Sequence, residues 1–321
     1  MSDGKMLIGI DLGGTNIKVG LVSIDGRLLG EKRVPTEVPR GPEQAVARMI
    51  EVSRQLLSEC QCGIAQVLAC GIGAPGPLNT RTGCIVKTPN LTGWDGAALA
   101  APVSQAMGIP VFLEGDANAA CWGEHWAGAG RGVDNMLMIT LGTGVGGAAI
   151  VNGQLIRGRD DTGGHIGHMV VEPGGAQCGC GRKGCLEAYA SATATARRFR
   201  DAVARGKSSS LQAGAELSSR DIYEAARSGD KLARQIIELT GWYVGIVLGG
   251  LANVLNPELC CVAGGMIHAG EMLFKPMRDS LVEHSLEAPG QRLRVIPAEL
   301  GEPAGIIGAA GCALNRYRAG A

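Results

Sequence analysis

The segment from Gly164 to Glu187 restricts the possible fold of this chain more than any other stretch. It holds two of the five histidines and three of the eleven cysteines, and four residues follow the spacing His-x9-Cys-x-Cys-x4-Cys. Zinc in proteins favours four tetrahedral thiolate and imidazole ligands, and clustered cysteines in a chain that is not secreted usually bind a metal. The pattern predicts a closed, structural Zn2+ site with the ligands His168, Cys178, Cys180 and Cys185. The alternative is a loop of reduced cysteines without a metal.

Length and composition indicate a globular protein of two domains. A chain of 321 residues exceeds the usual size of one domain, and an apolar content of 45% is ample for packed cores. Aromatic residues make up only 3%, so these cores must consist of aliphatic and small side chains. The formal net charge is zero, which removes the electrostatic footprint of a nucleic-acid binder.

The sequence also predicts a cytoplasmic protein that binds no membrane. The N-terminal residues MSDGKMLIGID contain neither the long apolar segment nor the cleavage site of a signal peptide. The longest apolar run, residues 242–255, is shorter than a membrane span and contains three glycines. Eleven cysteines are an odd number without a disulfide framework, which indicates reduced thiols.

A strand, a glycine-rich turn and a second strand begin the chain. Strands are expected at residues 7–11, 17–24 and 28–34, and the first two flank the turn Leu12-Gly13-Gly14-Thr15. Glycines let backbone N–H groups approach phosphate oxygens, to which Thr15 adds a hydroxyl. Asp11, at the strand end, could hold Mg2+ directly or through water. On local evidence alone, an ordinary hairpin with a Gly-Gly turn explains this stretch equally well.

The same arrangement recurs later in the chain. A strand at 135–141 is followed by Gly142-Thr143-Gly144-Val145-Gly146-Gly147, a strand to residue 151 and an Asn152-Gly153 hairpin signal. This internal repeat predicts two domains of common ancestry, each presenting a phosphate loop to a shared cleft. The repetition favours phosphate binding over a plain hairpin at both turns.

Further elements follow from apolar periodicity and from the positions of glycine and proline. Gly264-Gly265-Met266-Ile267 is expected to open a helix against a nucleotide. Asn90 could bond a sugar hydroxyl or make a turn, and Asp116 could be a catalytic base or, as local evidence favours, a helix cap. We expect helices at 42–59, 114–126, 193–204, 219–228, 230–253 and 304–318, and strands at 67–72, 110–113, 259–263 and 293–297.

Four motifs resemble the ROK family of sugar kinases, and the resemblance runs through essentially the whole chain. They are Asp11-Leu-Gly-Gly-Thr15, Gly142-Thr-Gly144, Gly167-His168 and the Cys-x-Cys-Gly-x-x-Gly-Cys set that begins at Cys178. Within the family the chain is most similar to bacterial ATP-dependent glucokinases, and two further motifs add to that: Pro89-Asn90-Leu91-x-Gly93-Trp94 and Gly305-x-x-Gly308-Ala309-Ala310.

The resemblance implies an α/β, two-domain actin-like (RNase H-like) ATPase fold with an interdomain cleft. It implies a small domain at 1–118, on which a C-terminal helix at 304–321 packs, and a large domain at 119–303 that carries the zinc loop. The implied reaction is ATP-dependent phosphorylation of the 6-hydroxyl of a hexose, with D-glucose as the expected substrate. ATP, Mg2+ and structural Zn2+ are the implied cofactors, and a homodimer is the implied assembly.

The resemblance also assigns roles to individual residues. Asp116 matches the general base that takes the proton from the sugar's 6-hydroxyl. The positions that match sugar contacts are Asn90, Asp116, His165, His168 and Glu187. The positions on the phosphate, Mg2+ and nucleotide side are Asp11, Gly13, Gly14, Thr15, Lys18, Gly142, Thr143, Gly144, Gly264 and Gly265.

The chain departs from the family pattern at two positions. Gly115 stands where the family usually has asparagine, which removes an amide worth about 0.5–1.5 kcal/mol of hydrogen bonding to a sugar hydroxyl. His165 stands where glucokinases usually carry glutamate, and a histidine can donate a bond where a carboxylate only accepts. Because a donor suits an acetamido carbonyl, N-acetylmannosamine or another N-acetylhexosamine is the alternative substrate.

Other classes of function are also compatible with the family. A sugar-responsive repressor would carry a helix-turn-helix domain ahead of the first phosphate loop, whereas Asp11 lies ten residues from the first residue. A sugar-binding protein without catalysis would explain Gly115 and His165, but Asp116 and both phosphate loops are intact. Polyphosphate as donor would need a strongly basic track, and the absence of a dense Lys/Arg run favours ATP.

Overall fold

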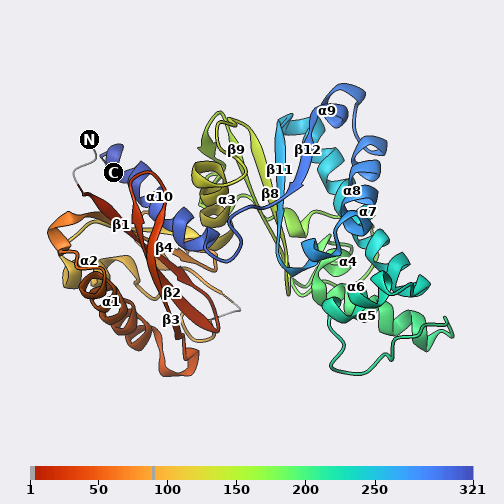
Figure 1. Cartoon of the computed structure of the whole chain (residues 1–321), viewed down its shortest axis with the longest axis horizontal. Coiled ribbons are helices and arrows are strands. Elements are labelled where there is room, and N and C mark those ends of the chain that lie inside the picture. The colour runs from red at the N-terminus through yellow and green to blue at the C-terminus, as the bar shows by residue number, and fades with distance from the viewer. Residues whose placement is uncertain (1–3, 89–90, 321) are drawn as a thin grey trace. The chain divides into compact units, whose positions relative to one another are not determined.

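The computed structural model describes residues 4–88 and 91–320, which divide into two compact units (Figure 1). Unit 1 takes the chain up to Gly132, the segment Leu155–Gly164 and the chain from Glu299 onward. Unit 2 takes Val133–Gln154 and His165–Ala298. The domain boundary expected at residue 118 falls inside helix α3 (Asp116–Ala127), all of which belongs to unit 1.

A five-stranded mixed sheet forms the centre of unit 1. The central strand β1 pairs antiparallel with β2 and parallel with β4, and the strand order is β3-β2-β1-β4-β7. Almost all of β1 is buried, as expected for a strand covered on both faces. The strands are β1 (Met6–Leu12), β2 (Asn16–Ser23), β3 (Leu28–Pro35), β4 (Val67–Ala74) and β7 (Val111–Gly115).

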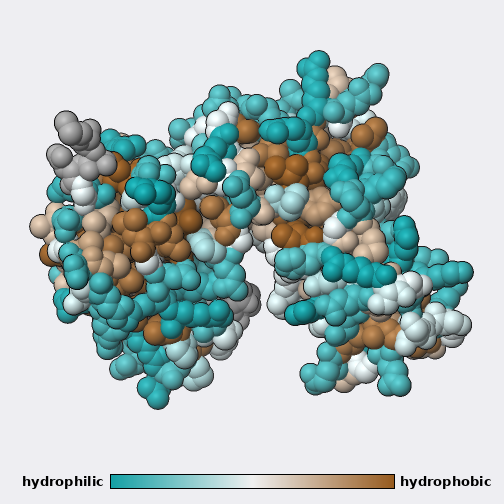
Figure 2. Space-filling view, in the orientation of Figure 1, coloured by the Kyte–Doolittle hydropathy of each residue, from teal (hydrophilic) through white to brown (hydrophobic). Residues whose placement is uncertain are grey.

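Side chains of β1 alternate between two apolar layers, as the two-residue period of a strand requires. Ile8 and Ile10 pack in one layer with α1 (Pro42–Glu59) and α2 (Ala100–Met107). Leu7 packs in the other with α10 (Ala304–Arg318). The expected bounds of α1 and α10 are confirmed, and the visible outer side of α1 is mostly hydrophilic, as its amphipathic pattern predicts (Figure 2).

Small residues let α10 lie directly against α3. A Cβ at Gly308 would overlap the backbone carbonyl of Ala119 in α3.

We therefore expect Gly308→Ala to lower the free energy of unfolding by about 1–3 kcal/mol, because the backbones of the two helices would have to move apart. Urea unfolding would measure this. Gly250→Ala in helix α7 (Lys231–Leu255) is the control, because open space surrounds that position. It should be neutral or stabilise by up to about 1 kcal/mol, and equal losses in both variants would contradict the packing argument.

Unit 2 repeats the sheet of unit 1. Its strand order β10-β9-β8-β11-β12 matches β3-β2-β1-β4-β7 position by position, and β8 again pairs antiparallel on one side and parallel on the other. The internal repeat read from the two glycine-rich turns is therefore present in the topology. The strands are β8 (Met136–Leu141), β9 (Val145–Val151), β10 (Gln154–Leu155), β11 (Leu259–Ala263) and β12 (Arg294–Pro297).

The longest helix, α7 (Lys231–Leu255), packs against α8 (Glu271–Glu283) in unit 2. By length and composition alone α7 could cross a membrane, yet 56% of its most apolar window is buried inside the protein, and core helices pass the same test. The other helices of this unit are α4 (Glu187–Ala190), α5 (Ala192–Ala204), α6 (Ser219–Arg227) and α9 (Glu287–Arg292).

Several short elements were not predicted from the sequence. The helix expected from Gly264 is a short 3-10 helix, η4 (Gly265–Ala269), and the α-helix α8 begins only at Glu271. A small hairpin of β5 (Leu78–Asn79) and β6 (Cys84–Ile85) follows β4. Further 3-10 turns are η1 (Val38–Arg40), η2 (Ile64–Gln66) and η3 (Ile166–His168).

Candidate active site and metal centre

The turn between β1 and β2 is held in one shape by its own backbone and by Thr36. The N–H of Gly13 donates to the carbonyl of Asn16 (2.9 Å). Thr36 donates its hydroxyl to the carbonyl of Gly13 (2.6 Å) and its N–H to the carbonyl of Thr15 (2.9 Å). The predicted phosphate loop Gly13-Gly14-Thr15 is thus a defined turn at the end of β1.

Asp11 lies beside this turn, opposite Lys18 on β2. The Lys18 ammonium is 3.8 Å from the Asp11 carboxylate, and a Cβ at Gly305 would lie 2.9 Å from the same carboxyl carbon. The N-terminal turn of α10 therefore reaches Asp11. Burial raises the pKa of Asp11 above its ordinary value, and Lys18 opposes this shift.

Asp116 is the first residue of α3, directly after β7. Its Oδ1 accepts a hydrogen bond from the N–H of Ala117 (2.7 Å), and solvent reaches the side chain. Protein crowded around the carboxylate disfavours its charged form and, with a smaller contribution from the Asp11 charge, raises the pKa of Asp116 to about 6. Such a carboxylate is suited to accept a proton near neutral pH.

A buried ion pair beside Asp116 was not predicted from the sequence. Glu114, at the end of β7, accepts two bonds from the guanidinium of Arg157 (2.8 and 2.7 Å). The sequence does contain a signal for such a pair, because Glu114 directly follows the apolar run Val111-Phe112-Leu113. A carboxylate at the end of a buried strand needs a partner for its charge. The partner itself could not be read from the sequence, since Arg157 lies 43 residues away.

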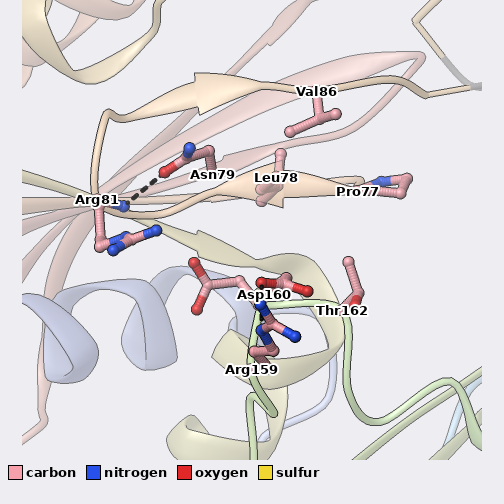
Figure 3. A pocket seen from close by; sticks show the side chains of 9 residues that line it. Pro77, Leu78, Asn79, Arg81, Val86, Arg159, Asp160 and Thr162 are labelled. Carbon is pink, nitrogen blue, oxygen red and sulfur yellow. Dashed lines mark hydrogen bonds and ion pairs between the residues drawn. The ribbon is translucent and has the colours of Figure 1, made fainter.

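Unit 1 also contains a cavity of about 380 Å3 beside the β5–β6 hairpin (Figure 3). Pro77, Leu78 and Val86 line one side, and Arg159, Asp160 and Thr162 line the other. Asp161 connects the two sides of the cavity. Its Oδ2 accepts hydrogen bonds from the N–H (3.1 Å) and the hydroxyl (2.8 Å) of Thr80.

The second glycine-rich turn, Gly142-Thr143-Gly144, follows β8 in unit 2. The N–H of Gly142 donates to the carbonyl of Gly144 (3.0 Å), and the hydroxyl of Thr193 donates to the carbonyl of Thr143 (3.0 Å). Thr193 lies in the first turn of α5, so this helix supports the turn.

The Gly264-Gly265 turn lies at the same sheet edge. Gly264 has φ 95°, and a Cβ there would overlap the carbonyl of Leu141 at the end of β8. Only glycine tolerates both conditions. The two turns are therefore neighbours at the carboxyl ends of adjacent parallel strands.

The four predicted zinc ligands converge. One donor atom from each of them lies within 4.8 Å of the others. The Nδ1 of His168 is 3.8 Å from the Cys178 sulfur, and the Cys180 and Cys185 sulfurs are 3.7 Å apart. A tetrahedron with Zn–S bonds of about 2.3 Å has edges of about 3.8 Å. The donor set and its spacing therefore fit a zinc ion.

Glu187 links this cluster to the second glycine-rich turn. Its Oε2 accepts from the N–H of Val145 (3.0 Å), and its Oε1 lies 3.4 Å from the Cys178 sulfur. His165 precedes η3, and its ring centroid is 6.2 Å from that of His168. The three predicted sugar contacts of unit 2, His165, His168 and Glu187, thus lie beside or among the four predicted zinc ligands.

The predicted site residues fall into two sets. Asn90 lies outside the described residues. Unit 1 holds Asp11, Gly13, Gly14, Thr15, Lys18 and Asp116. Unit 2 holds the zinc ligands, His165, Glu187 and the two glycine-rich turns at 142–144 and 264–265.

Known proteins match this chain over nearly its whole length. The chain matches the ROK family over residues 7–316. The chain belongs to the ROK family. A glucokinase from Thermotoga maritima is 39% identical to it over 308 residues, which is 95% of this chain and 96% of the relative. This identity supports the resemblance inferred from the motifs.

Two solved structures of ROK proteins share the fold. A ROK hexokinase from Thermus thermophilus superimposes with a TM-score of 0.82 at 32% identity, covering 98% of this chain and 99% of that one. A ROK family glucokinase from Streptomyces griseus, solved with glucose and AMPPNP, gives a TM-score of 0.79 at 34% identity and covers 97% and 99%. The α/β actin-like ATPase fold expected from the motifs is thereby confirmed.

Proposed function

We propose that this ROK protein is an ATP-dependent hexose kinase that converts D-glucose to glucose 6-phosphate, with Asp116 as general base. The observation that carries the proposal is the Asp116 carboxylate, which lies at the start of α3 within reach of solvent in a chain of the ROK family. The relative from Thermotoga maritima is a glucokinase, and the Streptomyces griseus structure contains glucose and AMPPNP. Both support glucose and ATP as the substrates.

The chemistry requires little from the protein beyond positioning and proton transfer. A hydroxyl is a weak nucleophile until a base removes its proton, and Asp116 would take that proton as the sugar oxygen attacks the γ-phosphorus of ATP. The phosphoryl group then leaves ADP and stays on the sugar oxygen. Backbone N–H groups of the turns at 13–15 and 142–144 would hold the phosphates, and Gly264-Gly265 the nucleoside side.

Two metals belong to the proposal. Mg2+, for which Asp11 offers a carboxylate ligand of the preferred kind, would neutralise phosphate charge. The Zn2+ held by His168, Cys178, Cys180 and Cys185 would be structural, because four protein ligands leave no open position. It would keep the loop of His165 and Glu187 in shape for the sugar. We also propose a cytoplasmic homodimer, with ATP rather than polyphosphate as donor.

The raised pKa of Asp116 predicts how the rate depends on pH. Only the deprotonated carboxylate can accept a proton, so kcat/KM should fall about tenfold per pH unit below pH 6 and level off above it. The midpoint of this acidic limb should be near 6, whereas an unperturbed aspartate would place it near 3.9. A pH series of initial rates measures the limb, and a midpoint near 4 would contradict the assignment.

ADP release with Mg-ATP across glucose, mannose, N-acetylglucosamine and N-acetylmannosamine tests the substrate. We expect the highest kcat/KM with glucose. Highest turnover with N-acetylmannosamine would instead make His165 a specificity residue that donates to the acetamido carbonyl. Sugar binding without turnover of any of the four would favour a binding protein over a kinase.

A further inference from the structure

Helix α3 begins without the capping side chain that helices usually have. Its N-cap residue is Gly115, which offers no side-chain acceptor, and the Asp116 carboxylate accepts hydrogen bonds from backbone N–H groups of the first turn, at Ala117 and at Asp116 itself. Glycine also loses more conformational freedom on ordering than other residues. The backbone that carries Asp116 at the start of α3 is therefore held by a group other than an N-cap side chain.

Glu114 supplies that group. Its Oε1 accepts from the N–H of Gly115 (3.1 Å) and from the side-chain amide of Asn118 (2.9 Å). These two donors lie on either side of Asp116 in the sequence. Glu114 thus clamps the strand end and the first turn of α3 together around the carboxylate.

Arg157 holds Glu114 in turn. Its Nε and Nη2 both donate to Glu114 Oε2, at 2.8 and 2.7 Å, and the side chains of Glu114 and Arg157 are only 4% and 26% exposed. Charge-assisted bonds from a guanidinium fork fix orientation as well as distance, especially where water is excluded. With these four bonds, both oxygens of the buried carboxylate are engaged.

We propose that Arg157 is a positioning residue for Asp116, acting through Glu114. Its guanidinium sets the orientation of Glu114, which sets the backbone at Gly115 and the first turn of α3, and thereby the aim of the Asp116 carboxylate at the sugar hydroxyl. The inference rests on the proposed role of Asp116 as general base. It gives the segment Leu155–Gly164 a part in the reaction that its sequence does not suggest.

A double-mutant cycle between Arg157 and Asp116 tests the proposal. Arg157→Met keeps the length of the side chain but removes both bonds, and it is compared in the wild-type and Asp116→Asn backgrounds. In the wild-type background we expect kcat to fall about 10- to 100-fold, the size of effect that a small misplacement of a reacting group causes. The glucose Kd, measured without ATP, should change less than about threefold. In the Asp116→Asn background the same substitution should change kcat less than about twofold, since no base is left to misplace.

Two further variants separate positioning from folding. Arg157→Lys retains the positive charge but cannot form both bonds to Glu114 Oε2, so we expect a kcat between those of wild type and Arg157→Met. Arg157→Lys also takes the place of Arg157→Met in the cycle if Arg157→Met does not fold. Thr80→Val is the matched control, because it removes the hydroxyl bond to Asp161, the second attachment of the same segment, and leaves every charge in place. It should keep kcat within about twofold.

The proposal would be overturned if Arg157→Met lowered kcat by the same factor in both backgrounds. It would also be overturned if Thr80→Val lowered kcat as much as Arg157→Met does in the wild-type background. Either result would describe a general effect on the fold. Turnover that Arg157 does not affect would also overturn it and leave the kinase assignment standing. Absence of turnover in the wild-type protein would instead remove the base role of Asp116, and this inference with it.

Discussion

Replacing Asp116 by asparagine is expected to lower kcat for glucose phosphorylation by about 10²–10⁴-fold, the usual contribution of a general base. The amide has the same shape as the carboxylate but cannot accept the proton of the 6-hydroxyl. It can still bond that hydroxyl, so the glucose Kd should stay within about threefold. Steady-state rates at saturating ATP give kcat, and calorimetric titration of glucose gives Kd.

Glu43→Gln provides the control for this substitution. Glu43 is an acidic residue in the first turn of another helix of the same unit, α1, so the change has the same chemistry at a comparable place. We expect its kcat to stay within about twofold of wild type. An Asp116→Asn protein that kept more than a tenth of wild-type kcat would remove Asp116 from the role of base.

Replacing Cys180 by serine is expected to release the zinc and to weaken glucose binding by roughly tenfold or more, because structural zinc is worth many kcal/mol to the fold around it. Cys180 is exposed, so the substitution disturbs little packing and acts through the metal. Without the metal, the loop that carries His165 and His168 loses its attachment to the three cysteines and keeps backbone hydrogen bonds, such as that from the Leu186 N–H to the Met169 carbonyl. Glu187 would keep its bond to the Val145 N–H but lose a fixed neighbour at Cys178. Metal analysis of the purified protein and calorimetric titration of glucose measure the two effects.

Cys62→Ser is the matched control, because Cys62 is a partly buried free cysteine far from the cluster in sequence. It should keep both the zinc content and the glucose Kd of wild type. A zinc-free Cys180→Ser protein with the wild-type glucose Kd would show that the metal and the sugar site are independent.

The parts of the fold that depend on local periodicity could be predicted. The amphipathic pattern of residues 42–59 gave the observed bounds of α1, and the apolar run at 259–263 gave those of β11. The convergence of the four predicted zinc ligands could also be predicted, because these donors lie within 18 residues of sequence. Information of this kind is contained in short stretches of sequence.

Features that depend on distant residues could not be predicted. The pairing of Glu114 with Arg157 and of Thr80 with Asp161 joins residues 43 and 81 positions apart. The start of α8 was placed too early because Gly264-Gly265 resembles a helix opening, whereas the close approach of Gly264 to Leu141 demands a tight turn there. The role of Glu187 in linking the metal cluster to the turn at 142–144 likewise appears only in three dimensions.

The place of α10 has a consequence for how the protein is made. Leu7, Val22 and Ala69, from strands near the start of the chain, share their apolar layer with Ile306 and Ala310. During synthesis, that side of the first sheet lacks the apolar side chains of α10 until residues 304–318 have emerged, whereas every strand and helix of unit 2 precedes them in the chain. Unit 2 can therefore complete its fold first, whereas the apolar layer of unit 1 stays incomplete until α10 has been synthesised.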